Sequence, residues 1–419
     1  MTPHTLLRGF FALLLAASLG YGILLRGERE ADPSAAPDKP RCAPILPSFL
    51  LPFFLAFCAL AALLFLPPEE FLPSMISLCF GIFLDLFLYD LALLLLLPGL
   101  RRSLNARTCA LLWILPNYLY LSQQSFLRPD HPSLILPLGA PAAPLAGIWL
   151  VGFAAFLLTK LLSHLLFRRS LLRGAQEILD PRIRALWRES LSWAGCPDAP
   201  YRLMRSAAAK TPLSIGFFRR TTCLVLPQRD YSEEELRLIF RHELVHIGRG
   251  DCATKFFLVF CTALCWFNPL MYLAMRRSAE DLELSCDETV LLAADQTTRR
   301  RYAELLLCTA GDERGFTTCL SARANTLRYR LRSVLAPRRR RIGGIAASLA
   351  FFLLLMGSGR IALAYESGSG QERLFAGGTS EAYTLSSCTR HDTDGYRFYD
   401  CTDPAALGAY LGSLSLCRL

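Results

Sequence analysis

The sequence contains no Cys-x-x-Cys pair, although it has fifteen cysteines. Such pairs supply most cysteine-bound metal sites, so a site of that kind is not expected. Many of the cysteines lie inside apolar runs, where a buried thiol behaves as a small hydrophobic side chain. Charged residues are also scarce, at 19%, whereas hydrophobic residues reach 53% and the mean hydropathy is +0.33. This composition excludes an ordinary soluble protein. Because the hydrophobic residues are concentrated in long runs, the sequence indicates membrane-spanning segments.

The net charge of +10 raises nucleic acid as a partner, but the arginines are placed differently. They cluster at the ends of apolar runs, at Arg101–Arg102, Arg168–Arg169 and Arg338–Arg341. Such placement follows the positive-inside rule, which keeps a segment in the cytoplasm, and it attracts anionic lipid headgroups. We therefore predict contact with membrane lipid and no direct binding of nucleic acid.

Six apolar runs are predicted to cross the membrane, at residues 4–26, 45–67, 72–99, 109–126, 141–166 and 342–364. A signal peptide is the alternative for the first run, but it has no clear small-x-small cleavage site and further spans follow. The fourth run is the weakest, because Pro116 and Asn117 interrupt it. Asp85 and Asp90 fall in or beside the third run, where an acidic group either pairs with another span or has a functional role.

The arginine-rich loops place residues 27–44, 100–108 and 168 onward in the cytoplasm, with the N-terminus outside. The predicted organisation is an N-terminal transmembrane region of about five helices at 1–167, a cytoplasmic domain at 168–341, a last span at 342–364 and a short extracytoplasmic tail at 365–419. In that tail Cys388 and Cys401 are candidates for a disulfide on the oxidising side, which leaves Cys417 odd.

The predicted cytoplasmic domain mixes helices and strands. Helical periodicity over Asp180–Trp193 is followed by two short predicted strands, Thr211–Phe218 and Thr221–Leu226. Such a hairpin either offers its edge to an extended peptide or simply covers the core. The domain is therefore expected to be α+β, inserted into a fold that is mainly α.

A helix-forming stretch further on contains His-Glu-x-x-His. Ser232 and Glu235 form a capping-box pattern ahead of it, which predicts a helix. His242 and His246 then lie one turn apart on the same face, where two imidazoles suit two corners of a zinc tetrahedron. Glu243 is the predicted general base that polarises the attacking water. A chance match is the alternative for so short a pattern.

An acidic run supplies the predicted third ligand. Glu283 and Asp287 stand four residues apart and share a helical face. Glu283 would complete a His2Glu site, and Asp287 would accept a hydrogen bond from a ligand imidazole. Asp251 either acts similarly or caps the helix. The alternative for the acidic run is a solvated charged face flanked by Arg276 and Arg277.

Residues 253–275 are apolar and long enough to span, but a crossing would separate His246 from Glu283 by the whole bilayer. This segment is therefore predicted to lie in the protein core, to dip into the interface or to form a hairpin broken at Asn268-Pro269. Each alternative puts the metal site close to the membrane surface.

These blocks resemble the membrane-integral zinc metalloprotease antirepressors that sense β-lactam antibiotics, the BlaR/MecR-like peptidases. The resemblance runs from about residue 211 to residue 292. It covers Thr211-Pro-Leu-Ser-Ile-Gly-Phe-Phe, His242-Glu-Leu-Val-His-Ile-Gly-Arg-Gly-Asp251, Trp266-Phe-Asn-Pro269 and Glu283-Leu-Ser-Cys-Asp287. The chain departs from the antibiotic sensors after the last span, where a large penicillin-binding domain is replaced by about fifty-five residues without Ser-x-x-Lys. Antibiotic sensing is therefore not expected.

The resemblance implies a polytopic helical bundle with a gluzincin-like zinc protease domain. It also implies a signal-transducing metalloendopeptidase that cleaves a winged-helix transcriptional repressor or the protein itself. One alternative is a housekeeping protease for membrane-protein quality control, and another is a non-proteolytic signalling or transport protein with a relict zinc site. For the oxyanion, Arg249, Arg276 and Arg277 are candidates, although solvated or lipid-facing arginines are the simpler interpretation.

Overall fold

The computed structural model describes residues 3–32, 40–46, 48–65, 82–121, 127, 129, 134–138, 142–308, 318–319, 324–336, 340–366, 371–376, 379–384, 388–393 and 396–401. Within these ranges the chain is mainly helical, as the sequence predicts. The helices are α1 (Pro3–Ala31), α2 (Leu50–Phe65), α4 (Phe83–Leu100), α5 (Ala106–Ile114), α6 (Ala142–Leu172), α7 (Pro181–Trp193), α8 (Glu233–Arg249), α9 (Asp251–Leu264), α10 (Pro269–Val290), α11 (Gln296–Cys308), α12 (Ala324–Leu335) and α13 (Gly344–Gly357), with 3-10 helices η1 (Leu115–Leu121) and η3 (Arg219–Thr221).

The strands form three sheets. One has the order β2-β3-β5-β4-β6, the second β1-β7-β8-β9 and the third β10-β11. Their bounds are β1 (Leu134–Leu138), β2 (Gln176–Glu177), β3 (Arg202–Arg205), β4 (Leu213–Ile215), β5 (Cys223–Leu226), β6 (Thr318–Cys319), β7 (Ile361–Glu366), β8 (Gln371–Ala376), β9 (Thr379–Thr384), β10 (Cys388–Thr393) and β11 (Tyr396–Cys401).

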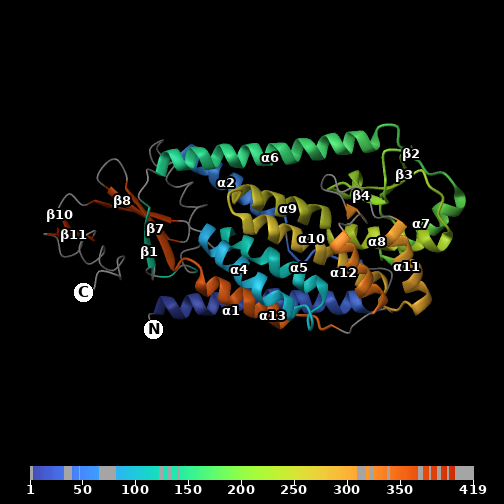
Figure 1. Ribbon diagram of the computed structural model, residues 1–419, viewed down its shortest axis with the longest axis horizontal. Helices are drawn as coiled ribbons and strands as arrows, with labels where there is room; N and C mark the ends of the chain where they lie inside the picture. The colour runs from blue at the N-terminus through green and yellow to red at the C-terminus, as the bar shows by residue number, and fades with distance from the viewer. Residues whose placement is uncertain are drawn as a thin grey trace.

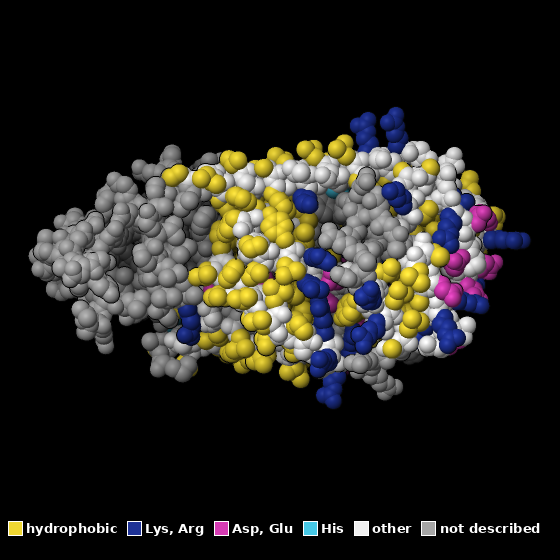
Figure 2. Space-filling model, in the orientation of Figure 1, with side chains coloured by type: hydrophobic (Ala, Val, Ile, Leu, Met, Phe, Trp, Pro, Cys, Tyr) yellow, Lys and Arg dark blue, Asp and Glu magenta, His cyan; other side chains and the backbone are white. Residues whose placement is uncertain are grey.

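The molecule is elongated, and its two ends differ (Figure 1). Strand β7 and the start of α1 lie at one end, whereas α7, α8 and α11 lie at the other. Hydrophobic side chains cover the middle of the visible face, and charged side chains gather towards the end that carries α7, α8 and α11 (Figure 2). This distribution matches a membrane-embedded middle with a polar end outside the bilayer.

Three helices in the described part of the chain are long and apolar enough to cross a membrane: Pro3–Ala31, Phe83–Leu100 and Ala146–Leu172. They overlap the first, third and fifth predicted spans, and residues 72–81 of the third prediction lie outside the described residues. The second and sixth predicted spans form the shorter apolar helices α2 and α13. Asp85 accepts a hydrogen bond from the Gly359 backbone N–H at 3.2 Å just beyond α13, so it contacts another apolar element.

The fourth predicted span, 109–126, overlaps α5 and contains η1. Asn105 caps α5 by accepting from the Thr108 N–H at 3.0 Å. The helix tightens to 3-10 geometry from Leu115, where Pro116 contributes no backbone donor. Every residue of α5 is buried, and its main contact is α10, so its apolar character reflects packing inside the protein. Residues 122–126 of that prediction lie outside the described residues.

The apolar segment 253–275 turns back on itself, as the hairpin alternative predicted. Helix α9 ends at Leu264, and α10 begins at Pro269. The Asn268 side chain caps α10 by accepting from the Leu270 N–H at 3.0 Å, and Pro269 fits the first helical turn because it needs no backbone partner. The reversal returns the chain to α8, so the two predicted metal-binding motifs lie side by side.

Helix α8 begins and ends where the local sequence predicts. Ser232 Oγ accepts from the Glu235 N–H at 3.2 Å, and Glu235 Oε2 accepts from the Ser232 N–H at 2.8 Å, which completes the predicted capping box. Gly250 ends the helix with φ of 71°, a left-handed conformation that favours glycine. Because α9 starts at the next residue, this turn places Asp251 directly beside the last turn of α8.

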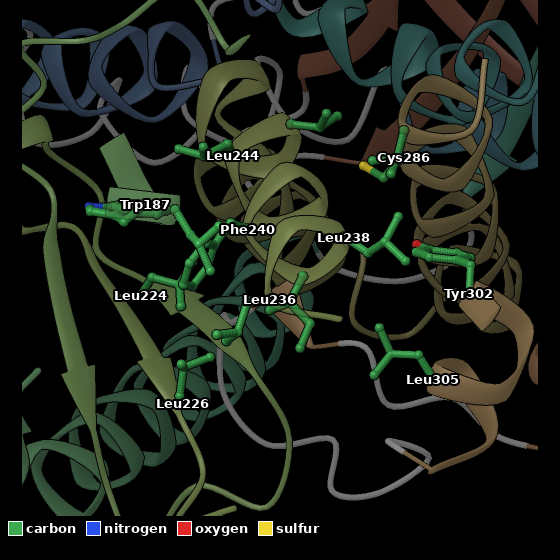
Figure 3. Packing of buried hydrophobic residues seen from close by; sticks show 14 of the residues in the cluster. Trp187, Leu224, Leu226, Leu236, Leu238, Phe240, Leu244, Cys286, Tyr302 and Leu305 are labelled. Carbon is green, nitrogen blue, oxygen red and sulfur yellow. The ribbon is translucent and has the colours of Figure 1, made fainter. Parts of the chain in front are cut away.

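The core of the α+β part surrounds α8 (Figure 3). On one side Phe240 meets Trp187 edge to face, with ring centroids 5.1 Å apart, and Leu224 of β5 lies below them. On the other side Leu238 faces Tyr302 of α11. Each such fully buried side chain contributes about 1.5–3 kcal/mol. The two predicted strands are present, but as shorter segments: β4 and β5 pair antiparallel around η3.

The tail strands bear on the predicted disulfide. In the antiparallel pair of β10 and β11, Cys388 lies directly opposite Cys401. This register is compatible with the pairing, which remains a prediction, and Cys417 lies outside the described residues.

Helices α1 and α13 pack through small residues. The buried face of α1 carries Ala12, Ala16 and Gly20, and Ser348 Oγ of α13 donates to the Ala16 carbonyl at 2.7 Å. A Cβ added at Gly20 would collide with the Ser348 side chain and lie 2.8 Å from the Gly344 carbonyl oxygen. Close approach of this kind is typical of helix pairs in membranes.

We predict that Gly20→Ala lowers the midpoint of thermal unfolding in detergent, because overpacking this contact costs about 1–3 kcal/mol. Gly22→Ala is the matched control, since an added Cβ there meets nothing within 4 Å. The control should be neutral or stabilising, because alanine favours helix over glycine. Equal midpoints for the two variants would contradict close α1–α13 packing.

Candidate metal centre

The two predicted motifs meet inside the protein. His242 and His246 on α8 place their Nε2 atoms 3.1 Å apart, and Glu283 Oε2 on α10 lies 3.7 Å from each of them. Both imidazoles are fully buried, and Glu283 is 6% exposed. These three side chains therefore form a compact group of one carboxylate and two imidazoles at the junction of two helices.

Hydrogen bonds assign the tautomers of both imidazoles. Asp251 Oδ2 lies 2.6 Å from His246 Nδ1, so Nδ1 carries the proton and Nε2 presents a lone pair. Tyr302 Oη lies 2.8 Å from His242 Nδ1 and donates to Asp287 Oδ1 at 2.6 Å. The hydroxyl proton is thus used by Asp287, and its oxygen accepts from His242 Nδ1–H.

This donor set fits a cation. The Nε2 atoms of His242 and His246 face each other, and Glu283 Oε2, which makes no hydrogen bond in the described part of the chain, lies 3.7 Å from each of them and 3.3 Å from Arg330 Nη1. Such an arrangement of acceptors is repulsive unless a positive charge lies between them. Tetrahedral zinc ligands at 2.0–2.1 Å are about 3.3 Å from one another. The separations of 3.1 and 3.7 Å therefore suit the three ligands of one zinc ion.

The electrostatic environment also favours positive charge. Burial disfavours a charged imidazole, yet Cys286, Glu283 and Asp251 together raise the pKa of His246 well above its ordinary value. Burial likewise disfavours a carboxylate, yet His246 and Lys255 hold the pKa of Glu283 well below its usual range. For His242, burial is the main cause that lowers the pKa to about 4, which keeps this imidazole neutral.

The supporting acids differ from the prediction in detail. Asp251 accepts directly from His246 Nδ1, which is the first of its two predicted roles. Asp287 was expected to accept from a ligand imidazole, but its Oδ1 is 3.5 Å from His242 Nδ1, and Tyr302 bridges the two groups. Arg330 of α12 donates to both oxygens of Asp287, at 2.6 and 2.7 Å.

Sequence reasoning missed Tyr302, Arg330, Lys255 and Cys286. Lys255 Nζ is 3.3 Å from Glu283 Oε1, and Cys286 Sγ is 3.3 Å from His246 Nδ1. Cys286 stands beside Asp287 in the quoted motif, but the others have no characteristic spacing from the histidines. Only the packing of α9, α11 and α12 against α8 and α10 brings them together.

The candidate oxyanion arginines have other partners. Arg276 and Arg277 pair with Glu280, at 3.1 and 2.9 Å. Arg249 is buried and donates to Glu30 of α1 at 2.8 Å. These contacts argue against a free guanidinium at the site from any of the three.

Glu243 is fully buried on α8. A cavity of about 70 Å³ reaches His246 from strand β4, and Ser214, Gly216 and Cys252 are among its lining residues. Of the two alternatives for the hairpin, the one that offers an edge to a peptide meets a strand of the chain itself, because β6 pairs antiparallel with β4. Among the described residues, the three candidate ligands are therefore almost wholly buried beside a small cavity.

Comparison with known proteins agrees with the resemblance. The family model of the BlaR1 peptidase M56 matches residues 123–333, half of the chain. The chain belongs to the BlaR1 peptidase M56 family. The matched range contains every residue of the candidate metal centre. Membership indicates a peptidase of a metalloprotease family, and the three candidate spans support a membrane location.

Individual relatives match shorter stretches. The regulatory protein BlaR1 of Bacillus licheniformis is 27% identical over 163 residues, which are 38% of this chain and 26% of the relative. The methicillin resistance mecR1 protein of Staphylococcus aureus is 30% identical over 105 residues, 24% of this chain and 18% of the relative. The methicillin resistance mecR1 protein of Staphylococcus epidermidis matches with the same identity and coverage. The chain thus spans about a quarter or less of the length of the curated relatives it matches.

We predict that His246→Ala abolishes stoichiometric zinc binding by the purified full-length protein, because the remaining two ligands hold a zinc ion weakly. Metal content measured by atomic emission tests this. His164→Ala is the control, since His164 is a buried histidine of α6 outside the cluster. Undiminished zinc in His246→Ala would remove this residue from the site.

Proposed function

We propose that the protein is a zinc-dependent membrane metalloendopeptidase that acts in signal transduction. The observation that carries this proposal is the convergence of His242, His246 and Glu283 on one point, within an M56 peptidase chain. We place the catalytic part at the cytoplasmic face of the membrane, because arginines flank it in the sequence. The tail from residue 365 then lies on the extracytoplasmic side. Membrane lipid surrounds the apolar helices, and no nucleic acid is bound.

The residues divide the chemistry among them. His242, His246 and Glu283 would hold Zn²⁺, with their orientation fixed by Tyr302, Asp251 and Lys255. A zinc ion held by these residues would supply Lewis acidity and make water a better nucleophile. Glu243 takes a proton from the attacking water and delivers it to the amine that leaves when the peptide C–N bond breaks.

The substrate is a protein, and two candidates follow from the family. One is a winged-helix transcriptional repressor, and the other is the chain itself. The pairing of β6 with β4 supports the second, because the chain's own Thr318–Cys319 segment pairs with β4, and Ser214 of β4 lines the cavity at His246. Main-chain pairing of this kind binds an extended peptide with little demand on its sequence.

Regulation is favoured over housekeeping by a buried contact between the first helix and the site. Glu30, at the end of α1, pairs with Arg249, the last residue of α8, and with Arg107 of α5. Arg249 also donates to Ser285 Oγ at 2.6 Å and Thr289 Oγ1 at 2.7 Å on α10. One guanidinium therefore joins a membrane helix to both helices of the candidate metal centre.

The other end of α1 holds the end of α13. Arg8 donates to the carbonyls of Leu355 and Ser358, each at 2.8 Å, and β7 starts only three residues beyond Ser358. A displacement of the tail is thus transmitted along α1 to Arg249. Breaking a buried ion pair costs about 3–5 kcal/mol. That is a large part of the roughly 5.5 kcal/mol that moves a two-state equilibrium from 1:99 to 99:1.

We predict that Glu243→Gln abolishes cleavage of a co-expressed repressor candidate and of the protein itself in membranes. The amide retains the size of the side chain but cannot take a proton, which should cost at least about 100-fold in rate. Glu233→Gln, at an exposed position of the same helix, is the control and should leave cleavage unchanged. Equal cleavage by wild type and Glu243→Gln would refute the catalytic assignment.

We predict that Glu30→Gln raises basal cleavage by about 5- to 150-fold, the usual range of coupling between sites. The three candidate ligands are buried among the described residues, so contacts that keep them buried would restrain activity, and Glu30 pairs with Arg249 at the end of the helix that carries both histidines. Cleavage per bound zinc in membranes is the measurement, with exposed Glu28→Gln as control. An unchanged or lower rate at full zinc content would show that Glu30 does not restrain the site.

A further inference from the structure

A series of three hydrogen-bonded, buried side chains lies behind the imidazole of His242. Tyr302 Oη contacts His242 Nδ1 at 2.8 Å and Asp287 Oδ1 at 2.6 Å. Arg330 donates to Asp287 through Nε and Nη2, at 2.7 and 2.6 Å. His242, Tyr302 and Arg330 are fully buried, and Asp287 is 1% exposed. Three helices, α10, α11 and α12, therefore contribute to the orientation of one imidazole on α8.

The hydrogen bonds fix which of these side chains donates a proton and which accepts it. Asp287 is held as a carboxylate by two charge-assisted bonds from Arg330, so it accepts and does not donate. Tyr302 must then donate its only proton to Asp287, and its oxygen accepts from His242 Nδ1–H. The Nε2 lone pair of His242 is consequently left facing Glu283 Oε2 and His246 Nε2.

The opposite tautomer is incompatible with this arrangement. It would place a proton on His242 Nε2 and a lone pair on Nδ1, where Tyr302 has no second proton to offer. An Nε2–H group cannot bind a metal ion. The hydroxyl of Tyr302 is therefore the group that decides whether His242 is a ligand.

We propose that Tyr302 is a positioning residue for the metal ligand His242, and that Asp287 and Arg330 act on the metal site through its hydroxyl. This rests on the proposed zinc site. The two ligand imidazoles thus have different supports, a carboxylate on His246 and a neutral hydroxyl on His242. Arg330 Nη1 also lies 3.3 Å from Glu283 Oε2, so the same guanidinium restrains two carboxylates on successive turns of α10.

The test measures zinc affinity of the full-length protein in detergent, by competition for Zn²⁺ with a chromogenic chelator. Loss of a partner that orients a ligand typically costs 10- to 100-fold, so Tyr302→Phe should bind zinc about 10- to 100-fold more weakly than wild type. Tyr118→Phe is the matched control, because it removes a buried hydroxyl whose oxygen makes no hydrogen bond in the described part of the chain. The control should retain wild-type affinity.

A double-mutant cycle separates positioning from general support of the fold. Asp287→Asn should weaken zinc binding too, and in the Tyr302→Phe background it should add little, because Asp287 acts through Tyr302. Fully additive losses of zinc affinity would overturn the proposal that Asp287 acts through Tyr302. Wild-type zinc affinity in Tyr302→Phe would overturn the role of Tyr302 itself, whereas failure of the wild type to bind zinc would refute the proposed function instead.

Discussion

The structure depends on one constraint: several groups that would be costly to bury alone are buried together around His242, His246 and Glu283. An isolated buried ion is strongly unfavourable, so each such group needs a partner of opposite charge or a hydrogen bond. Asp251 accepts from His246, Lys255 contacts Glu283, and the other partners come from α11 and α12. The helices of this part of the molecule are therefore held at the angles that let their side chains satisfy one another.

The same constraint joins the membrane region to the catalytic region. The sequence predicts a boundary near residue 168, yet Glu30 and Arg107 lie before it and share a buried cluster with Arg249. Burying Arg249 without Glu30 would leave an uncompensated charge beside α10. Helix α1 is thus part of the support of the metal centre, although most of its length is apolar. The boundary near residue 168 separates two compositions, but buried ion pairs cross it and stabilise both sides together.

Local chemistry made part of this architecture predictable. The Ser232–Glu235 capping box, the Asn268-Pro269 break and the one-turn spacing of His242 and His246 all follow from rules within a few residues. Tyr302 and Arg330 could not be found in this way, since their relation to His242 exists only through packing between helices. The span predicted at 109–126 stays a prediction, because its described part, α5 and η1, is apolar but α5 is wholly buried. Hydropathy does not distinguish a helix that faces lipid from one that, like α5, is buried against α10.

Enclosure and metal binding are linked by the way this site is built. Any movement that admits a peptide must displace an element packed on α8 or α10, and those elements carry the partners of the ligands. Displacing α11 would take Tyr302 away from His242, whereas displacing α9 would take Asp251 away from His246. The strand side is different, because Ser214 and Ile215 of β4 line the cavity at His246 and neither is one of the ligand partners described above. Access from the strand side would therefore leave the described partners of both imidazoles in place, whereas access past α9 or α11 would remove one of them.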